Sequence, residues 1–165
     1  MALDDDLLRL ALQEERLQFD SFNSVTALDI GMRVKALVEK RGAKVAIDIA
    51  LAGHPLFFYA MPGTTPDNVD WIRRKRNVVT RFHKSSYAFA LQMQKNGHTL
   101  ADRFGLSAAD CALSGGGFPV RLRGSGCVGT IVVSGLPHRE DHGVVVEVLA
   151  DFLGQDIVEL ALAKE

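Results

Sequence analysis

Two short stretches of this 165-residue chain carry side chains that could do chemistry. The first holds Arg74 and Lys75, whose cationic groups form strong hydrogen bonds with anionic ligands. The second is Asp141-His142, in which a carboxylate can orient a cation and an imidazole can transfer protons near neutral pH. These residue types favour either a binding site for an anion or an acid–base pair, and His83 and His138 are further candidates for acid–base or axial-ligand roles.

The position of Lys75 in its helical pattern is unusual. It lies three residues after Ile72 and four before Val79, so it interrupts an apolar stripe. A cation at such a position extends to solvent, pairs with a carboxylate or contacts an anionic ligand. The spacing leaves all three alternatives open.

Asp141 also has two interpretations. An acid in the first turn of a helix can simply offset the helix dipole. Alternatively, the helix that contains Lys75 and the helix that begins at His138 approach the same sheet, and the two side chains meet. We therefore hypothesise an ion pair between Lys75 and Asp141 that braces a site.

The stretch from Gly115 to His142 holds seven of the chain's fifteen glycines. Its pattern predicts a strand at residues 120–123, a turn at residues 124–126, an apolar inner strand at residues 127–133 and a helix from His138. Glycines beside core strands indicate a close approach of backbone to backbone, or of a ligand to backbone. Residues 115–117 precede a strand and do not match a nucleotide-binding glycine loop, so a phosphate cradle is not expected.

Composition and motifs exclude several classes of function. The net charge of −1, and a run of basic residues that would spread around a helix, argue against nucleic acid as a partner. An acidic N-terminus and the absence of a roughly 20-residue apolar run argue against a signal peptide and a membrane span. The two cysteines, Cys111 and Cys127, favour a reduced cytoplasmic protein. No hydrolase, metalloprotease, zinc or phosphate-loop motif is present, so whether the chain is an enzyme stays undecided.

The hydrophobic periodicity predicts the elements that must position these residues. We expect helices at residues 4–17 and 26–42, a hairpin of strands at residues 44–51 and 56–61, one long helix at residues 67–95 bent near residues 84–86, the glycine-rich hairpin, and a last helix at residues 138–153. Thr26 is the predicted cap of the second helix. Two hairpins separated by a helix predict the α+β class, with helices packed on an antiparallel sheet.

Several of these motifs together resemble a known family. They are Gly116-Gly117-Phe118-Pro119-Val120, the strand that ends Val132-Val133-Ser134-Gly135, the downstream Asp141 and the helical Lys75. The chain resembles the GlcG-like and HbpS-like haem-degrading-domain family, over roughly residues 20–155, and is most similar to its uncharacterised bacterial and fungal branch. It has Arg76 where the wider family commonly has alanine.

The resemblance implies one domain over residues 1–165, with a profilin-like or PAS-like antiparallel sheet of about five strands flanked by helices. It also implies a homo-oligomer and a small ligand, haem or another anion. The site that we expect lies between the long helix and the glycine turn, and consists of Arg74, Lys75, Gly115, Gly116, Gly117, Ser134, Asp141 and His142.

Three functions are compatible with these observations. The first is a small-molecule-binding domain in which Lys75 and Arg74 contact the ligand and Asp141 orients Lys75. The second is a structural protein that forms a homo-oligomeric scaffold without catalysis. The third is an enzyme that uses Asp141-His142 as an acid–base pair, although no nucleophile or metal-binding set accompanies it.

Overall fold

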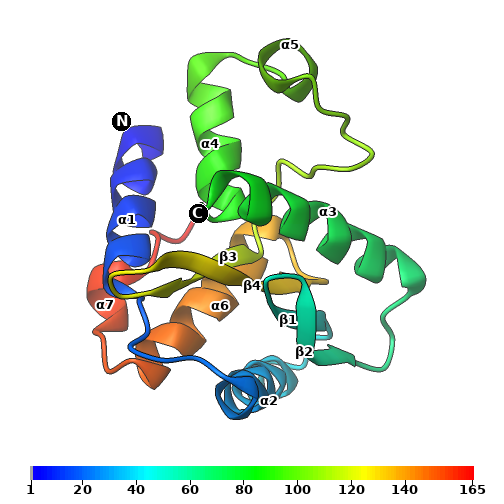
Figure 1. Ribbon diagram of the computed structural model, residues 1–165, viewed down its shortest axis with the longest axis vertical. Coiled ribbons are helices and arrows are strands. Elements are labelled where there is room, and N and C mark those ends of the chain that lie inside the picture. Colours follow the sequence, from blue (N-terminus) through cyan, green and yellow to red (C-terminus); the bar gives the residue numbers. More distant parts are fainter. Residues whose placement is uncertain (1) are drawn as a thin grey trace.

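The computed structural model describes residues 2–165, and over these residues the fold is of the α+β class, as predicted. Helices cover both faces of an antiparallel sheet (Figure 1). Helices and strands follow one another as α1 (Ala2–Arg16), α2 (Ser24–Lys40), β1 (Ala46–Leu51), β2 (His54–Ala60), α3 (Pro66–Phe82), α4 (Ser86–Asn96), α5 (Leu100–Phe104), β3 (Gly117–Leu122), β4 (Gly126–Ser134), α6 (His138–Phe152) and α7 (Ile157–Leu160).

The sheet has the strand order β2-β1-β4-β3, and all neighbours are antiparallel. The expected number of about five strands is close, because a fifth segment pairs with the β3 edge through Phe19 alone. The Phe19 amide donates to the Arg121 carbonyl at 2.8 Å, and the Arg123 amide donates to the Phe19 carbonyl at 2.9 Å. One bridging residue is too short to count as a strand.

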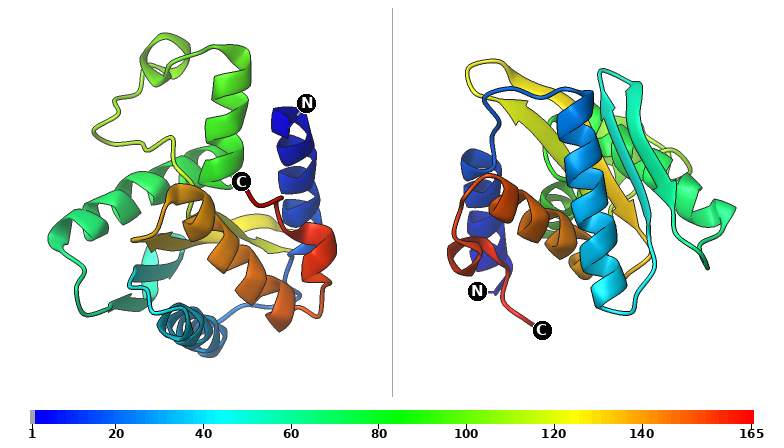
Figure 2. Two further views of the ribbon diagram at one scale, coloured as in Figure 1. Left: turned by 180° about the vertical axis from the view of Figure 1, so that it is seen from behind. Right: turned by 90° about the horizontal axis from the view of Figure 1, so that it is seen from below.

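The two faces of the sheet are covered by different helices (Figure 2). Helices α2 and α6 cover one face, and the largest apolar cluster lies between them and the sheet. Helix α3 crosses the other face over β1, β4 and β3. The alternation in β1 follows this arrangement, since Ile47 and Ile49 belong to the large cluster whereas Ala46 packs with Ile72 of α3.

The predicted long helix is two helices. Helix α3 ends at Phe82, because His83 adopts a left-handed conformation with φ of 56°. Ser85 then caps α4, accepting a hydrogen bond from the Ala88 amide at 3.1 Å. The interruption lies where a bend was expected, but it separates two helices and turns α4 toward α1.

Smaller differences concern the ends of elements. Asn23, not Thr26, is the N-cap of α2; its side chain accepts from the amides of Val25 and Thr26, and Thr26 completes the capping box by accepting from the Asn23 amide. The residues expected in the turn of the first hairpin, His54 and Pro55, already belong to β2. Within residues 2–165, no helix combines the length and the apolar character that crossing a membrane requires.

Candidate functional site

The predicted ion pair between Lys75 and Asp141 is present and buried. Lys75 Nζ lies 2.9 Å from Asp141 Oδ2 and also donates to the Val133 carbonyl at 3.0 Å. Lys75 is 2% exposed and Asp141 is 1% exposed. Of the three alternatives for a cation on an apolar stripe, the structure therefore shows the pairing with a carboxylate. The pair connects α3 to α6 around the end of β4.

Asp141 is held by the backbone that precedes its helix as well as by Lys75. Its Oδ1 accepts from the Leu136 amide at 2.9 Å, and its Oδ2 lies 3.4 Å from the Gly135 amide. Burial raises the pKa of the Asp141 carboxyl, an effect that Lys75 and these two amides oppose. Burial likewise lowers the pKa of the Lys75 ammonium, against the influence of Asp141.

The glycine turn packs directly against this ion pair. A Cβ atom on Gly116, whose φ is +128°, would lie 2.3 Å from the Val133 carbonyl oxygen and 2.8 Å from Lys75 Nζ. A Cβ atom on Gly117 would lie 2.8 Å from Val79, and the Gly117 amide donates to Ser86 Oγ at 2.9 Å. The space beside Lys75 is thus filled by backbone, and these two glycines are explained by close packing.

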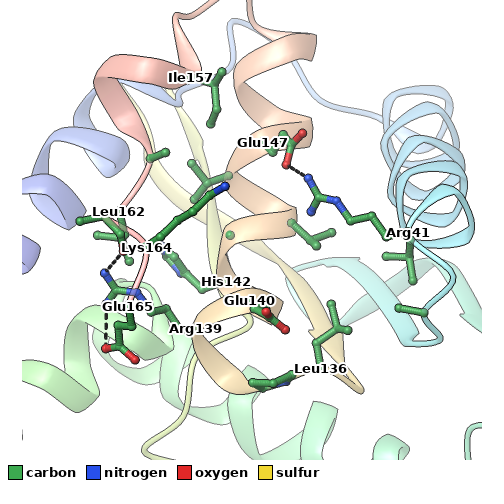
Figure 3. Close-up of a pocket in the computed structure, with 18 of the residues that line it drawn as sticks. Arg41, Leu136, Arg139, Glu140, His142, Glu147, Ile157, Leu162, Lys164 and Glu165 are labelled. Carbon is green, nitrogen blue, oxygen red and sulfur yellow. Dashed lines mark hydrogen bonds and ion pairs between the residues drawn. The ribbon is translucent and has the colours of Figure 1, made fainter.

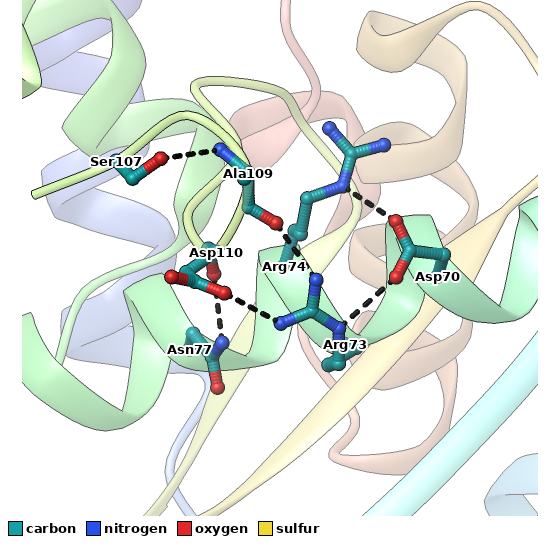
Figure 4. A network of polar contacts seen from close by, with 7 residues as sticks. All are labelled: Asp70, Arg73, Arg74, Asn77, Ser107, Ala109 and Asp110. Atoms are coloured by element: carbon teal, nitrogen blue, oxygen red, sulfur yellow. Dashed lines mark hydrogen bonds and ion pairs between the residues drawn. The ribbon is translucent and has the colours of Figure 1, made fainter.

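Arg74 lies apart from Lys75 and belongs to another network (Figure 4). Its Nε is 3.1 Å from Asp70, and its guanidinium stacks over the Trp71 ring at 3.9 Å. Arg73 joins the same carboxylate to Asp110, at 3.0 and 3.1 Å. This network attaches the loop that follows α5 to the outer side of α3, which gives Arg74 a structural role.

The other predicted site residues lie around the pair without forming one cavity. Ser134 is buried at the end of β4, where it pairs with Ala46. The Gly115 amide donates to His138 Nδ1 at 3.3 Å. The structure therefore brings Lys75, Asp141 and the glycine turn together, but not Arg74 or His142.

His142 is directed toward α1. Its Nε2 lies 2.7 Å from Gln13 Oε1, and Gln13 Nε2 donates to the Leu160 carbonyl at 2.7 Å. Since the Gln13 amide nitrogen is the donor to Leu160, its oxygen accepts from His142 and the imidazole carries its proton on Nε2. His142 Nδ1 is buried without a hydrogen-bond partner in the described part of the chain.

Burial determines the protonation state of this imidazole. It lowers the pKa of His142 to about 3, with smaller contributions from Arg139 and His138. Asp141 and His142 thus have separate buried partners and share no reactive space. The acid–base pair considered from the sequence is not supported by this geometry.

A groove of about 790 Å³ runs along the outer side of α6 (Figure 3). We call it the α6 groove; its walls come from the end of α2, the loop before α6, and α7 with the C-terminal residues that follow it. It is lined by Gln13, Val38, Arg41, Ala43, Leu136, Pro137, Arg139, Glu140, His142, Gly143, Val144, Val146, Glu147, Ile157, Ala161, Leu162, Ala163, Lys164 and Glu165.

Charged residues of both signs surround the apolar lining of the α6 groove. Arg41 pairs with Glu147 across it. Arg139 is bound by Asp6 at 2.7 Å and by the Ala163 carbonyl at 2.6 Å. In contrast, Lys164 pairs with no carboxylate of residues 2–165, and Figure 3 shows its side chain directed from the C-terminal segment toward α6.

Sequence reasoning identified one lining residue of this groove, His142, and missed the others. They come from segments that are far apart in the chain, and no local spacing signals their meeting. Gly143 was the one signal available, because a glycine inside an otherwise regular helix requires an explanation.

Comparisons with known proteins agree with the resemblance noted in the sequence. A UPF0303 protein of Azotobacter vinelandii is 54% identical over 162 residues, covering 98% of both chains. The crystal structure of Ybr137w protein superposes with a TM-score of 0.82 at 30% identity, over 90% of this chain and 87% of that one. The crystal structure of a PduOC:heme complex shares the fold, with a TM-score of 0.65 at 15% identity over 79% of this chain and 92% of that one. The family model of haem-degrading HbpS-like proteins matches residues 22–150, and the chain belongs to this family.

Proposed function

We propose that this protein binds a small molecule in the α6 groove and works as a homo-oligomer. The observation that carries the proposal is the groove itself. Its volume of about 790 Å³ lies within the range of roughly 300–1,000 Å³ that is typical of ligand sites. Its lining combines apolar side chains with charged groups, and in ligand sites such polar groups fix the orientation of the ligand.

The α6 groove is a better candidate than the space between Lys75 and the glycine turn. Lys75 already donates to Asp141 and to the Val133 carbonyl, and Gly116 leaves no room for even a methyl group beside it. A ligand there would have to break a buried ion pair. In the α6 groove, a ligand can bind without breaking a buried ion pair.

The expected anionic character of the ligand stays a prediction, and Lys164 supports it. Arg41 and Arg139 are engaged by carboxylates of the protein, so neither is a free partner for an anion. Lys164 has no such partner in the described chain and can pair with an acidic group of a ligand. Glu140 lines the same groove, so the anion would bind beside Lys164 and away from this carboxylate.

Haem is the ligand that the family name suggests, and the groove does not fit haem held by an axial side chain. A protein ligates haem iron through histidine, cysteine, methionine or tyrosine. Among the described lining residues, His142 is the one of these types. Its Nε2 is bound to Gln13 and its Nδ1 is buried in the protein, so neither nitrogen is open to the groove.

A pair of matched fluorescent probes tests the proposal. 8-Anilinonaphthalene-1-sulfonate and N-phenyl-1-naphthylamine share one aromatic body, and only the first carries an anionic group. We expect both to bind with saturation at one site per chain, the sulfonate more tightly. Leu136→Lys, which places a charge in the apolar wall, should weaken the binding of the uncharged N-phenyl-1-naphthylamine at least about tenfold. Leu113→Lys, in the loop that precedes β3, should change the affinity of neither probe.

Haem is titrated in parallel, and no Soret shift typical of histidine ligation is expected. Saturable binding that is insensitive to Leu136→Lys, or no binding of either probe, would refute the groove as the ligand site. A histidine-ligated haem spectrum that is lost in His142→Gln would overturn the assignment of His142 as an unavailable residue.

A structural role is the second candidate, and the outer face of α2 favours it. Val25, Leu28 and Met32 are exposed there at the spacing of one helical stripe. We propose that this stripe contacts a second copy of the chain. The two candidates are compatible, because the stripe and the α6 groove do not share residues.

We also propose that the protein is located in the cytoplasm. Cys111 and Cys127 are both free thiols, and burial raises the pKa of each. Unpaired thiols of this kind suit a reducing compartment.

A further inference from the structure

Gly143 is a glycine that no contact within the described part of the chain explains. It lies in the interior of α6, where its backbone is helical and outside the left-handed region that favours glycine. Glycine in a helix interior is less favourable than alanine by about 1 kcal/mol. A glycine at this position is therefore explained by either a close internal neighbour or a close external one.

The structure excludes an internal neighbour. A Cβ atom added to Gly143 would meet no atom of residues 2–165 within 4 Å. The comparison with Gly31, the glycine inside α2, is informative, since a Cβ atom there would lie 2.4 Å from the ring of Phe57. Gly31 is required by packing, whereas Gly143 leaves open space above the helix.

The open space above Gly143 is part of the α6 groove. Glu140 lies about one turn before Gly143 on the same side of the helix, and Glu147 lies about one turn after it. Both are lining residues of the groove. The two positions are about 10 Å apart along the helix axis at a rise of ~1.5 Å per residue, and at Gly143 between them the helix carries no side chain.

We propose that Gly143 is the point at which a flat ring system of the ligand lies against the backbone of α6, so that it determines which ligands the groove accepts. This inference rests on the proposed function, and it specifies the ligand as a molecule with a planar apolar body. A ring face that contacts a bare helical turn gains dispersion contacts along its whole surface, which a methyl group at this position would prevent. The interval of about 10 Å between the Glu140 and Glu147 positions accommodates two fused rings.

The test uses Gly143→Ala and Gly143→Leu with the two naphthalene probes described above. Both substitutions introduce better helix formers into open space, so both should raise Tm, by about 2–4 °C for Gly143→Ala. Both should also weaken the binding of the two probes, by at least about tenfold for Gly143→Ala and further for Gly143→Leu. The combination of a more stable protein and weaker binding separates a lost contact from a damaged fold.

Thr80→Ala is the matched control, because Thr80 is exposed on α3 and alanine improves that helix as well. It should raise Tm slightly and leave both affinities unchanged. If both Gly143 variants bind within about twofold of the wild type while Leu136→Lys does not, the role of Gly143 is refuted and the groove remains the ligand site. If the wild type binds neither probe, the proposed function fails as well. A lower Tm for Gly143→Ala would contradict the open space on which the inference depends.

Discussion

At the scale of single residues, Lys75 and Asp141 illustrate how a buried ion pair can join two helices of a fold. The desolvation of two charges is costly, and their attraction compensates for it only when further hydrogen bonds satisfy both groups. Here the Val133 carbonyl and the Leu136 amide supply those bonds. The pair therefore fixes the start of α6 relative to α3, but contributes little net stability compared with an apolar pair.

Breaking one side of this pair should be far more costly than removing both charges. Lys75→Met leaves Asp141 buried without its cation, and we expect a loss of about 3–5 kcal/mol in the free energy of unfolding. The double variant Lys75→Met/Asp141→Asn removes both charges and keeps an oxygen that accepts from the Leu136 amide, so it should regain at least ~1 kcal/mol. Urea denaturation followed by circular dichroism measures both values.

Lys40→Met serves as the control for this experiment, because Lys40 is exposed at the end of α2. Its effect should stay within about 0.5 kcal/mol. A Lys75→Met variant as stable as Lys40→Met would show that the ion pair has no structural role.

His142 should make the protein sensitive to acid. Its pKa is lowered to about 3 in the folded protein from an ordinary value of 6.5, so the unfolded chain binds a proton that the folded chain excludes. The stability linked to this residue is complete above pH 6.5 and declines as the pH falls toward 3. The slope approaches about 1.4 kcal/mol per pH unit in this window.

His142→Gln isolates this contribution, because glutamine does not titrate and its amide can still donate to Gln13. The unfolding free energy of the wild type, measured by urea denaturation from pH 7.5 to 4.5, should decline more steeply than that of the variant. The pKa values of Glu14, Asp48 and Asp141 are raised by burial and act in both proteins, so they cancel in the difference. Parallel curves would mean that the pKa of His142 is the same in the folded and unfolded chains.

At the scale of helices and strands, most of the fold was predictable because the signals are local. The alternation of Ile47 and Ile49 with Asp48 defined a strand with two different faces, and the structure places those faces against different helices. The register of Lys75 on its helix left a carboxylate partner as one of three alternatives, and the hypothesised pairing with Asp141 is present. Hydrophobic periodicity indicates which face of a helix or strand is buried, and these inferences depended on that information.

The failures at this scale have physical causes as well. The long helix divides at His83 because a left-handed residue at that point allows Ser85 to cap a new helix, and a histidine gives little sequence signal for that conformation. Arg74 and Lys75 are adjacent in sequence but differ by about 100° around the helix, so only one of them could face Asp141. The α6 groove was not predictable, because it depends on how α7 and the C-terminal residues pack against α6.

At the scale of the whole molecule, the α2 side has the features of a surface that contacts a second copy. Val25, Leu28 and Met32 form an exposed apolar stripe on α2. Four of the five charged side chains of the same helix form the pairs Arg33–Asp29 and Lys35–Glu39, so the paired charges offset one another. A balanced surface of this kind is complementary to another copy of itself and less so to a strongly charged partner.

Leu28→Lys should therefore disrupt self-association. Leu28 is 55% exposed at the centre of the stripe, and a buried lysine at a symmetric interface would meet its own copy across the contact. We expect the wild type to form an oligomer in size-exclusion chromatography with multi-angle light scattering. Leu28→Lys should raise the dissociation constant of this oligomer at least about tenfold, so that more of the protein elutes as the monomer. The far-ultraviolet circular dichroism spectrum should not change.

Leu8→Lys is the matched control for this prediction, because Leu8 is 72% exposed on α1 and is not part of the stripe. The same loss of apolar surface and the same added charge at Leu8 should leave the oligomer intact. If both variants dissociate equally, net charge and not the α2 stripe governs assembly. A monomeric wild type would remove the homo-oligomer and the scaffold role together, whereas ligand binding in the α6 groove would stand, because a single chain supplies every residue that lines it.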